Sequence, residues 1–217
     1  VVANYSTTAL PQAGISGTQS MESAAAPDAS TAATAAGTTF VVNSTADAPD
    51  ASLNGVCATT AGVCTLRAAI AEANAQTGPN TINFNIPGTG VQTIQLTSQL
   101  PTINDQTGPL TIDGYTQPGA APNTDPLASN AVIRIQIVGT GENNFGGLRI
   151  VSSGNVVRGL AMYKLTQAIR FYGSGGNDNV VTGSFIGTDA AGTYFATATY
   201  PGKSGVHIQA GASRNRV

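Results

Sequence analysis

The only two cysteines of the chain, Cys57 and Cys64, lie seven positions apart in the stretch GVCATTAGVCTLRAAIAEANA. Two thiols at this separation could form a disulfide, bind a metal ion or act as a redox pair. A zinc site needs four ligands, and the single histidine, His207, is distant in sequence. Redox pairs usually have the spacing Cys-x-x-Cys, which this stretch lacks. We therefore predict a disulfide between Cys57 and Cys64, which indicates an oxidising, extracellular compartment.

The carboxylates are the next residues that could do chemistry. Polysaccharide lyases and glycosidases need clustered carboxylates with a base, or a carboxylate pair that flanks a sugar bond. Asp113 in TIDG and Asp189 in GTDAAG each stand beside a turn glycine, where aspartate typically forms the turn. His207 in GVHIQ has no neighbouring acid in sequence to orient it as a base, which favours a solvated surface residue. The sequence therefore predicts no catalytic residue, no cofactor and no bound metal.

The positive charges give no extended basic surface. The nine lysines and arginines are scattered singly and the net charge is −2, so nucleic acid is not expected as a partner. No run of eighteen apolar residues exists, and we expect neither a membrane span nor a retained signal peptide. Arg149, Arg158 and Arg170 could stack as a basic column that meets acidic glycans. Independent solvated side chains explain them equally well.

The elements that must position these residues are short strands. Only 9% of the 217 residues are charged, 26 are glycine and none is tryptophan. β-Branched runs alternate with turn signals such as PGTG and TGP, which is typical of an all-β protein. The expected strands are 39–43, 81–86, 91–97, 110–113 and 131–138.

The last third of the chain contains a repeat. Three segments share a short strand, a Gly/Ser turn and an asparagine followed by a second strand; they are 147–160, 168–187 and 205–217. The asparagines are Asn155, Asn179 and Asn215, separated by 24 and 36 residues. This period predicts a right-handed parallel β-helix, in which aligned asparagines can hydrogen-bond as a ladder. Turn chemistry with a left-handed backbone accounts for these asparagines equally well.

A helix is expected over 65–75, with Thr65 as its N-cap. Its apolar residues recur at i, i+3, i+4 and i+7, and they are Leu66, Ala69, Ile70 and Ala73. The first turn of a solenoid exposes an apolar end and unpaired strand edges. We therefore assign this helix, with Leu66, Arg67 and Ile70, as a cap over that end, and the disulfide as the staple that leads into it.

The stretch FVVNSTADAPDASLNGVCATTAGVCTLRAAIAEANA resembles the CSLREA domain, found at the start of secreted bacterial β-helix proteins. The signature Cys-Ser-Leu-Arg-Glu-Ala is here Cys64-Thr65-Leu66-Arg67-Ala68-Ala69. Alanine in place of the glutamate removes the reciprocal half of a capping box. TINFNIPGTGVQTIQL, LTIDGYTQPGAAPNT and SFIGTDAAGT resemble the continuation of such proteins, so the likeness covers most of 38–217. The resemblance implies the fold and secretion, but no particular function.

The sequence predicts three parts: an Ala/Ser/Thr-rich arm over 1–37, a cap over 38–80 and β-helix coils over 81–217. We expect an extracellular or cell-surface structural or adhesive protein. The arm could add as a strand to a second copy, which would give a homo-oligomeric head-to-tail filament, or it could lie on its own solenoid. The alternative is a carbohydrate-active enzyme or glycan-binding module on the same scaffold, with cell-surface glycans as partners.

Overall fold

The computed structural model describes residues 36–140, 145–194 and 204–217. Almost the whole arm predicted over 1–37 lies outside these residues. In the described part, the strands form three sheets, and all strand pairs within these sheets are parallel. This arrangement agrees with the all-β prediction.

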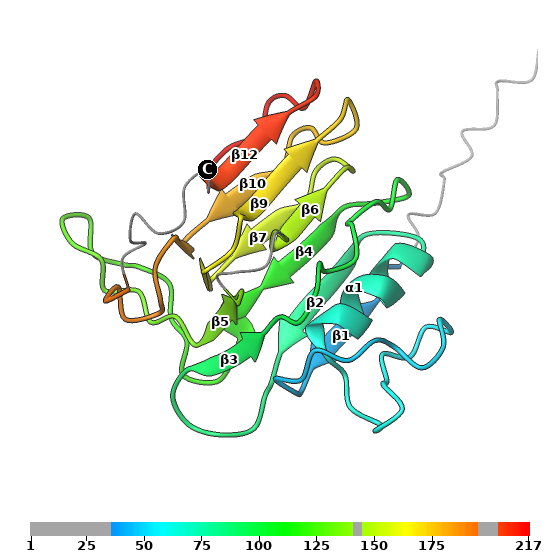
Figure 1. Ribbon diagram of the computed structural model, residues 1–217, viewed down its shortest axis with the longest axis horizontal. Helices are drawn as coiled ribbons and strands as arrows, with labels where there is room; N and C mark the ends of the chain where they lie inside the picture. Colours follow the sequence, from blue (N-terminus) through cyan, green and yellow to red (C-terminus); the bar gives the residue numbers. More distant parts are fainter. Residues whose placement is uncertain (1–35, 141–144, 195–203) are drawn as a thin grey trace, which may run out of the picture. The chain divides into compact units, whose positions relative to one another are not determined.

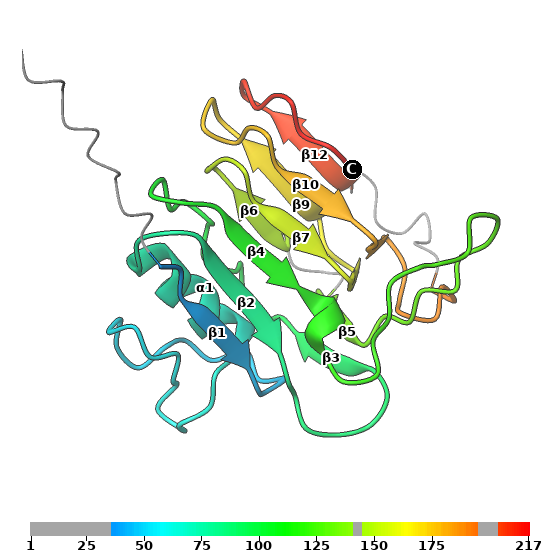
Figure 2. The ribbon, with the colours of Figure 1, turned by 180° about the vertical axis from the view of Figure 1, so that it is seen from behind.

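The first sheet has the strand order β1-β2-β4-β7-β10 (Figures 1 and 2). Its strands are β1 Thr39–Val42, β2 Asn80–Phe84, β4 Leu110–Asp113, β7 Val156–Arg158 and β10 Val180–Thr182. The second sheet has the order β11-β8-β5-β3. Its strands are β3 Gln92–Gln95, β5 Ile135–Val138, β8 Leu160–Tyr163 and β11 Phe185–Ile186. The third sheet, β12-β9-β6, consists of β6 Leu148–Ile150, β9 Gln167–Tyr172 and β12 Ser204–Gln209.

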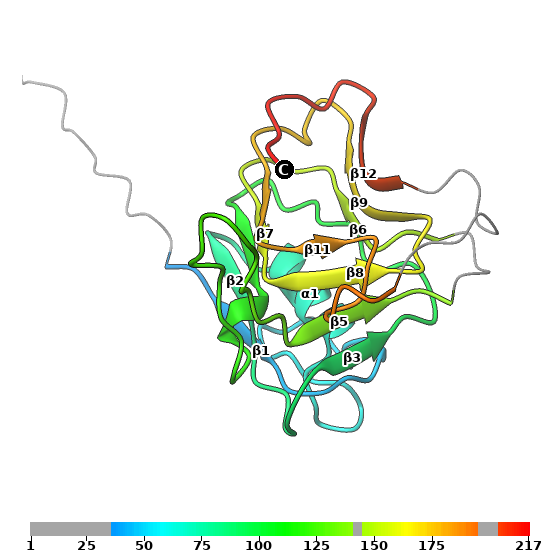
Figure 3. The ribbon, with the colours of Figure 1, turned by 90° about the vertical axis from the view of Figure 1, so that its left-hand side faces the viewer.

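The chain visits the three sheets in a fixed order. Strands β4, β5 and β6 lie in the first, second and third sheet, and β7 to β9 and β10 to β12 repeat that sequence. Figure 3 shows the second sheet between strands of the other two. The isolated parallel bridge between Ile103 and Ile150 adds an earlier visit to the third sheet, and the bridge between Val180 and Arg216 adds a later return to the first. Each passage therefore lies in register on the one before it.

The core is built from columns of equivalent side chains. Ile82, Ile112, Val157 and Val181 occupy one register position on successive strands of the first sheet, and all four are buried. Ile94, Ile137 and Met162 form the corresponding buried column of the second sheet. Because side chains alternate between the two faces of a strand, every second residue contributes to such a column.

Helix α1, Leu66–Ala75, occupies the region predicted to be helical. It packs against β1 and β2 (Figure 1). Leu66, Ala69 and Ile70 are fully buried and belong to the same apolar cluster as the strand columns. The helix is therefore continuous with the core of the sheets.

Four of the five predicted strands are shorter than expected: β1 ends at Val42, β3 spans only Gln92–Gln95, and local contacts shorten the other two. The strand expected over 81–86 ends at Phe84, because the Phe84 N–H donates to Thr116 Oγ1 (2.7 Å) and the Ile86 N–H to Gln117 Oε1 (2.9 Å) instead of to a neighbouring strand. In the segment expected over 131–138, Val132 forms an antiparallel bridge with Ala121, and the parallel strand begins only at Ile135. Side-chain acceptors and a reversal of pairing direction thus set these ends.

We predict that Gly114→Ala destabilises the fold strongly. An added Cβ would overlap the carbonyl oxygen of Gly159 in the next passage, and a backbone atom cannot move aside without disturbing the sheets. We expect a loss of about 2 kcal/mol or more in the free energy of unfolding, measured by urea denaturation. Gly62→Ala is the control, because its Cβ meets nothing within 4 Å and it carries only the strain of a φ of +72°. Equal losses in the two variants would contradict the close approach.

Candidate functional site

Cys57 and Cys64 form the predicted disulfide, with Cα atoms 5.1 Å apart. The loop that the bond closes is also held by the Thr59 N–H, which donates to the Val63 carbonyl oxygen at 2.8 Å. Cys64 is buried in the apolar cluster immediately before α1. The disulfide therefore ties the loop to the start of the helix.

Thr65 and Arg67 connect the helix to the loops around it. Thr65 Oγ1 accepts from the Ala68 N–H at 3.1 Å, as predicted for the N-cap, and donates to the Ala48 carbonyl oxygen at 2.6 Å. Arg67 forms a two-pronged ion pair with Asp47, at 2.9 Å from Nε and 2.8 Å from Nη2, and its Nη1 donates to the Gln99 carbonyl oxygen at 2.7 Å. The sequence predicted Arg67 as part of the cap. It gave no local signal that Asp47 is its partner, because the two residues lie 20 positions apart in the chain.

Glu72 is a second anchor, which the sequence analysis missed. Its side chain is fully buried. The carboxylate accepts hydrogen bonds from the backbone N–H groups of Asn54 (3.0 Å) and Gly55 (2.8 Å). The sequence feature that could have identified it is the position of a charged residue next to the apolar stripe of the predicted helix. Arg67 and Glu72 thus hold the loop that precedes the disulfide from two points on one helix.

The structure brings Asn155, Asn179 and Asn215 together in one column. Asn155 Nδ2 donates to Asn179 Oδ1 at 2.7 Å, and Asn179 Nδ2 donates to Asn215 Oδ1 at 3.0 Å. The same oxygens accept the backbone N–H groups of Asn155 (2.8 Å) and Asn179 (2.9 Å). Asn179 and Asn215 therefore each contact both the side-chain amide and the backbone N–H of the preceding asparagine.

The column extends further toward the N-terminus than the repeat indicated. Asn155 Oδ1 accepts the Leu110 N–H at 2.8 Å, so a leucine fills the next position. Asn80, which is paired in register with Leu110, accepts the Thr38 N–H at 3.0 Å through Oδ1. Asn80 was not predicted as a member of the column, because the repeat is not recognisable in the sequence before residue 147.

The left-handed backbone considered for the asparagines lies one residue earlier. Gly154, Asp178 and Arg214 have φ values of 76°, 56° and 56°, and each directly precedes an asparagine of the column. The side chains of Asp178 and Arg214 form an exposed ion pair at 2.7 Å. The asparagine ladder and the left-handed turn are therefore parts of one feature, and the interpretation of the asparagines themselves as left-handed residues is wrong.

Asp113 and Asp189 are engaged by their own surroundings. Asp113 is buried, and its oxygens accept from the Tyr115 N–H at 3.0 Å and from Arg158 Nη2 at 2.6 Å. Asp189 accepts from the N–H and hydroxyl of Thr193, at 2.7 and 2.6 Å. Both aspartates thus form turns, as expected, and Asp113 additionally joins two strands of the first sheet.

Arg158 does not belong to the basic column considered as one interpretation of the three arginines. This residue lies in β7 of the first sheet and pairs with Asp113, whereas Arg149 and Arg170 are register partners in β6 and β9 of the third sheet. Arg158 lies 9 residues after Arg149 and 12 before Arg170, which is less than one 24-residue repeat, so it cannot occupy the same position as either of them on a neighbouring coil.

Tyr115 is a further residue in contact with Asp113. Burial, and then the negative charge of Asp113, raise the pKa of the Tyr115 hydroxyl above its ordinary value near 10. The hydroxyl donates to the Gly183 carbonyl oxygen at 2.6 Å. A cavity of about 520 Å³ lies here, lined by Tyr115, Pro122, Asn123, Arg158, Thr182 and Gly183. Because Asp113 already neutralises Arg158, the charges of this cavity are balanced within the protein.

The described residues contain no cluster of three or more His, Cys, Asp or Glu side chains that could hold a metal ion. Within the same residues, no helix has the length and apolar character needed to cross a membrane. Comparisons with protein-family models, curated sequences and solved structures gave no match.

We predict that Asn179→Ala destabilises the protein by about 3 kcal/mol, because the buried backbone N–H and the side-chain amide of Asn155 both lose Asn179 Oδ1 as their acceptor. The measurement is urea denaturation followed by circular dichroism. Asn85→Ala, which removes an exposed asparagine, is expected to change the unfolding free energy by less than about 0.5 kcal/mol. An Asn179→Ala variant as stable as the parent would show that the column contributes nothing.

We also predict that reduction of Cys57–Cys64 lowers the free energy of unfolding by about 2–3 kcal/mol, since the bond restricts the unfolded chain. Thermal melts with and without reductant measure the effect. The double variant Cys57→Ser/Cys64→Ser should melt like the reduced parent and be insensitive to reductant. Unchanged melting of the parent under reduction would argue against a stabilising role.

Proposed function

We propose that this protein is a secreted structural or adhesive component built as a right-handed parallel β-helix. The observation that carries this proposal is the column of Asn155, Asn179 and Asn215, whose amides bond each passage to the next. These bonds run in the same direction as the backbone hydrogen bonds of the three parallel sheets. Neighbouring passages are therefore joined along all three sheets and also by the side-chain amides, which suits a stiff module.

The N-terminal end carries a second feature that fits a solenoid. Helix α1 covers the apolar residues beside β1 and β2, and the disulfide, Arg67 and Glu72 fix the loop around it. Such a cover protects the end of a stacked core from association through its edges. The resemblance of this region to the CSLREA domain supports secretion, as does the disulfide.

The head-to-tail association remains part of this proposal. Residues 1–37, proposed as the arm between copies, lie almost entirely outside the described residues. Among the described residues β12 is an edge strand of the third sheet, and its Ile208 is in register with the buried Phe171, yet 45% of its surface is exposed. An added strand at β12 would bury this side chain, which is favourable by the hydrophobic effect.

The test is the oligomeric state of the full chain at high concentration, by light scattering and negative-stain electron microscopy. We expect linear assemblies that are lost when residues 1–37 are deleted. Ile208→Asp is the matched variant at the receiving end, and it should weaken assembly while the folded monomer persists. Monomers for the full chain and both variants alike would contradict the filament.

A further inference from the structure

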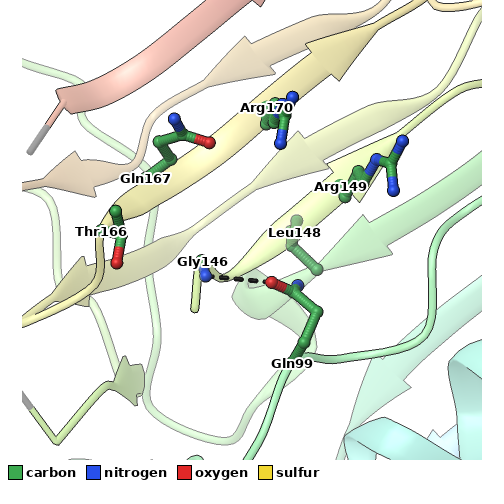
Figure 4. Close-up of a pocket in the computed structure, with 7 residues that line it drawn as sticks. All are labelled: Gln99, Gly146, Leu148, Arg149, Thr166, Gln167 and Arg170. Atoms are coloured by element: carbon green, nitrogen blue, oxygen red, sulfur yellow. Dashed lines mark hydrogen bonds between the residues drawn. The ribbon is translucent and has the colours of Figure 1, made fainter. Parts of the chain in front are cut away.

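The outward face of the third sheet carries a row of basic side chains. Arg149 of β6 is the register partner of Arg170 of β9, which in turn is the partner of His207 of β12. Figure 4 shows the two arginines side by side on neighbouring strands. Adjacent strands are about 4.8 Å apart, so the two positive charges occupy neighbouring places on one face.

Both guanidinium groups lie against one aromatic ring. The Cζ atoms of Arg149 and Arg170 each lie 4.6 Å from the centre of the Tyr172 ring. With its amide turned so that donors meet acceptors, Gln209 presents its oxygen to Nε and Nη2 of Arg170. Tyr172 and Gln209 are neutral, so they orient the guanidinium groups without cancelling their charge.

No carboxylate of the described residues balances this charge. The ion pairs present there engage Arg67, Arg158 and Arg214. In addition, Nε of Arg149 is buried and donates no hydrogen bond to any described group. This atom is out of reach from solvent, so an anion at this face would be held by the other nitrogen atoms of the two guanidinium groups, whose charge no described carboxylate offsets.

A cavity of about 170 Å³ lies beside the arginines (Figure 4), lined by Gln99, Gly146, Leu148, Arg149, Thr166, Gln167 and Arg170. Its wall is fixed, because Gln99 accepts from the Gly146 N–H at 2.9 Å and donates to the Gly147 carbonyl oxygen at 2.8 Å. Gln167 is hydrogen-bonded to Nδ1 of His207 at 2.9 Å. The space is smaller than the roughly 300–1,000 Å³ of pockets for drug-sized ligands, so it suits one small polar group.

We propose that this face binds the carboxylate of an acidic saccharide, with Arg149 and Arg170 as the charged donors. A guanidinium group presents N–H donors in a planar fork that matches the two oxygens of a carboxylate. The neighbouring amides of Gln167 and Gln209 are of the type that bonds sugar hydroxyls. A nucleic acid fits less well, because a net charge of −2 and two arginines give little phosphate neutralisation.

This inference does not depend on the filament or on the structural role. A stiff module needs no unbalanced positive charge on one face, and binding at this face requires no second copy. The site can therefore be tested on a protein that proves to be monomeric.

The experiment is isothermal titration of the full chain with trigalacturonate, and with its methyl ester as the uncharged counterpart. We expect binding of trigalacturonate only. Arg149→Gln and Arg170→Gln should each lower the affinity about tenfold or more, since each removes a charge-assisted hydrogen bond. Arg149→Lys keeps the charge without the planar fork and should still lose affinity. The control Arg134→Gln removes an arginine outside the third sheet and should leave the affinity within about twofold.

The proposal would be overturned by no binding of trigalacturonate, by equal binding of the methyl ester, or by equal losses in Arg134→Gln and the third-sheet variants. A single-stranded oligothymidylate is the competing polyanion, and an affinity equal to that for trigalacturonate would also overturn it. Circular dichroism of each variant separates loss of the site from loss of the fold. Should Arg149→Gln unfold, Arg170→Gln and Arg149→Lys still decide the matter.

Discussion

The structure depends on keeping successive passages of the chain in register, and a buried amide enforces this. Asn179 is fully buried, so its oxygen and nitrogen must both find partners inside the protein. They find them on Asn155 and Asn215, in the passages on either side. A shift by one residue would turn every core side chain outward and would also leave these amides unpaired. Apolar burial alone sets the alternation, whereas the amides fix which residues lie opposite one another.

The turn before each asparagine follows from the same requirement. A residue with positive φ redirects the chain so that the next side chain points inward. Glycine does this without strain at position 154, whereas Asp178 and Arg214 adopt the strained conformation and form an ion pair with each other. Because that pair is exposed, it contributes little to stability. The hydrogen bonds of the buried amides therefore offset the energetic cost of the positive-φ backbone.

The sequence predicted local features well, and it predicted long-range contacts only where the repeat marks them, as in the asparagine column. The disulfide, the helix with its Thr65 cap and the alternating strands all depend on residues close together in the chain. The Arg67–Asp47 pair, the buried Glu72 and the sheet assignment of Arg158 depend on which segments meet in space. Asp113 was interpreted from the glycine beside it, which describes the turn but not its partner. Composition does not predict such partners, because they meet only when successive passages of the chain stack on one another.

The polar groups of the protein fall into two classes, and the difference carries functional meaning. In the interior, Glu72, Asp113 and the asparagine column form their hydrogen bonds with other groups of the chain. These polar groups therefore stabilise the fold. On the third sheet, Arg149 keeps a buried donor without a described acceptor, next to a second arginine. Folding accounts for the first class completely. It does not account for the second, since two like charges on one face oppose each other. An anion from outside the chain supplies the negative charge that these two arginines lack.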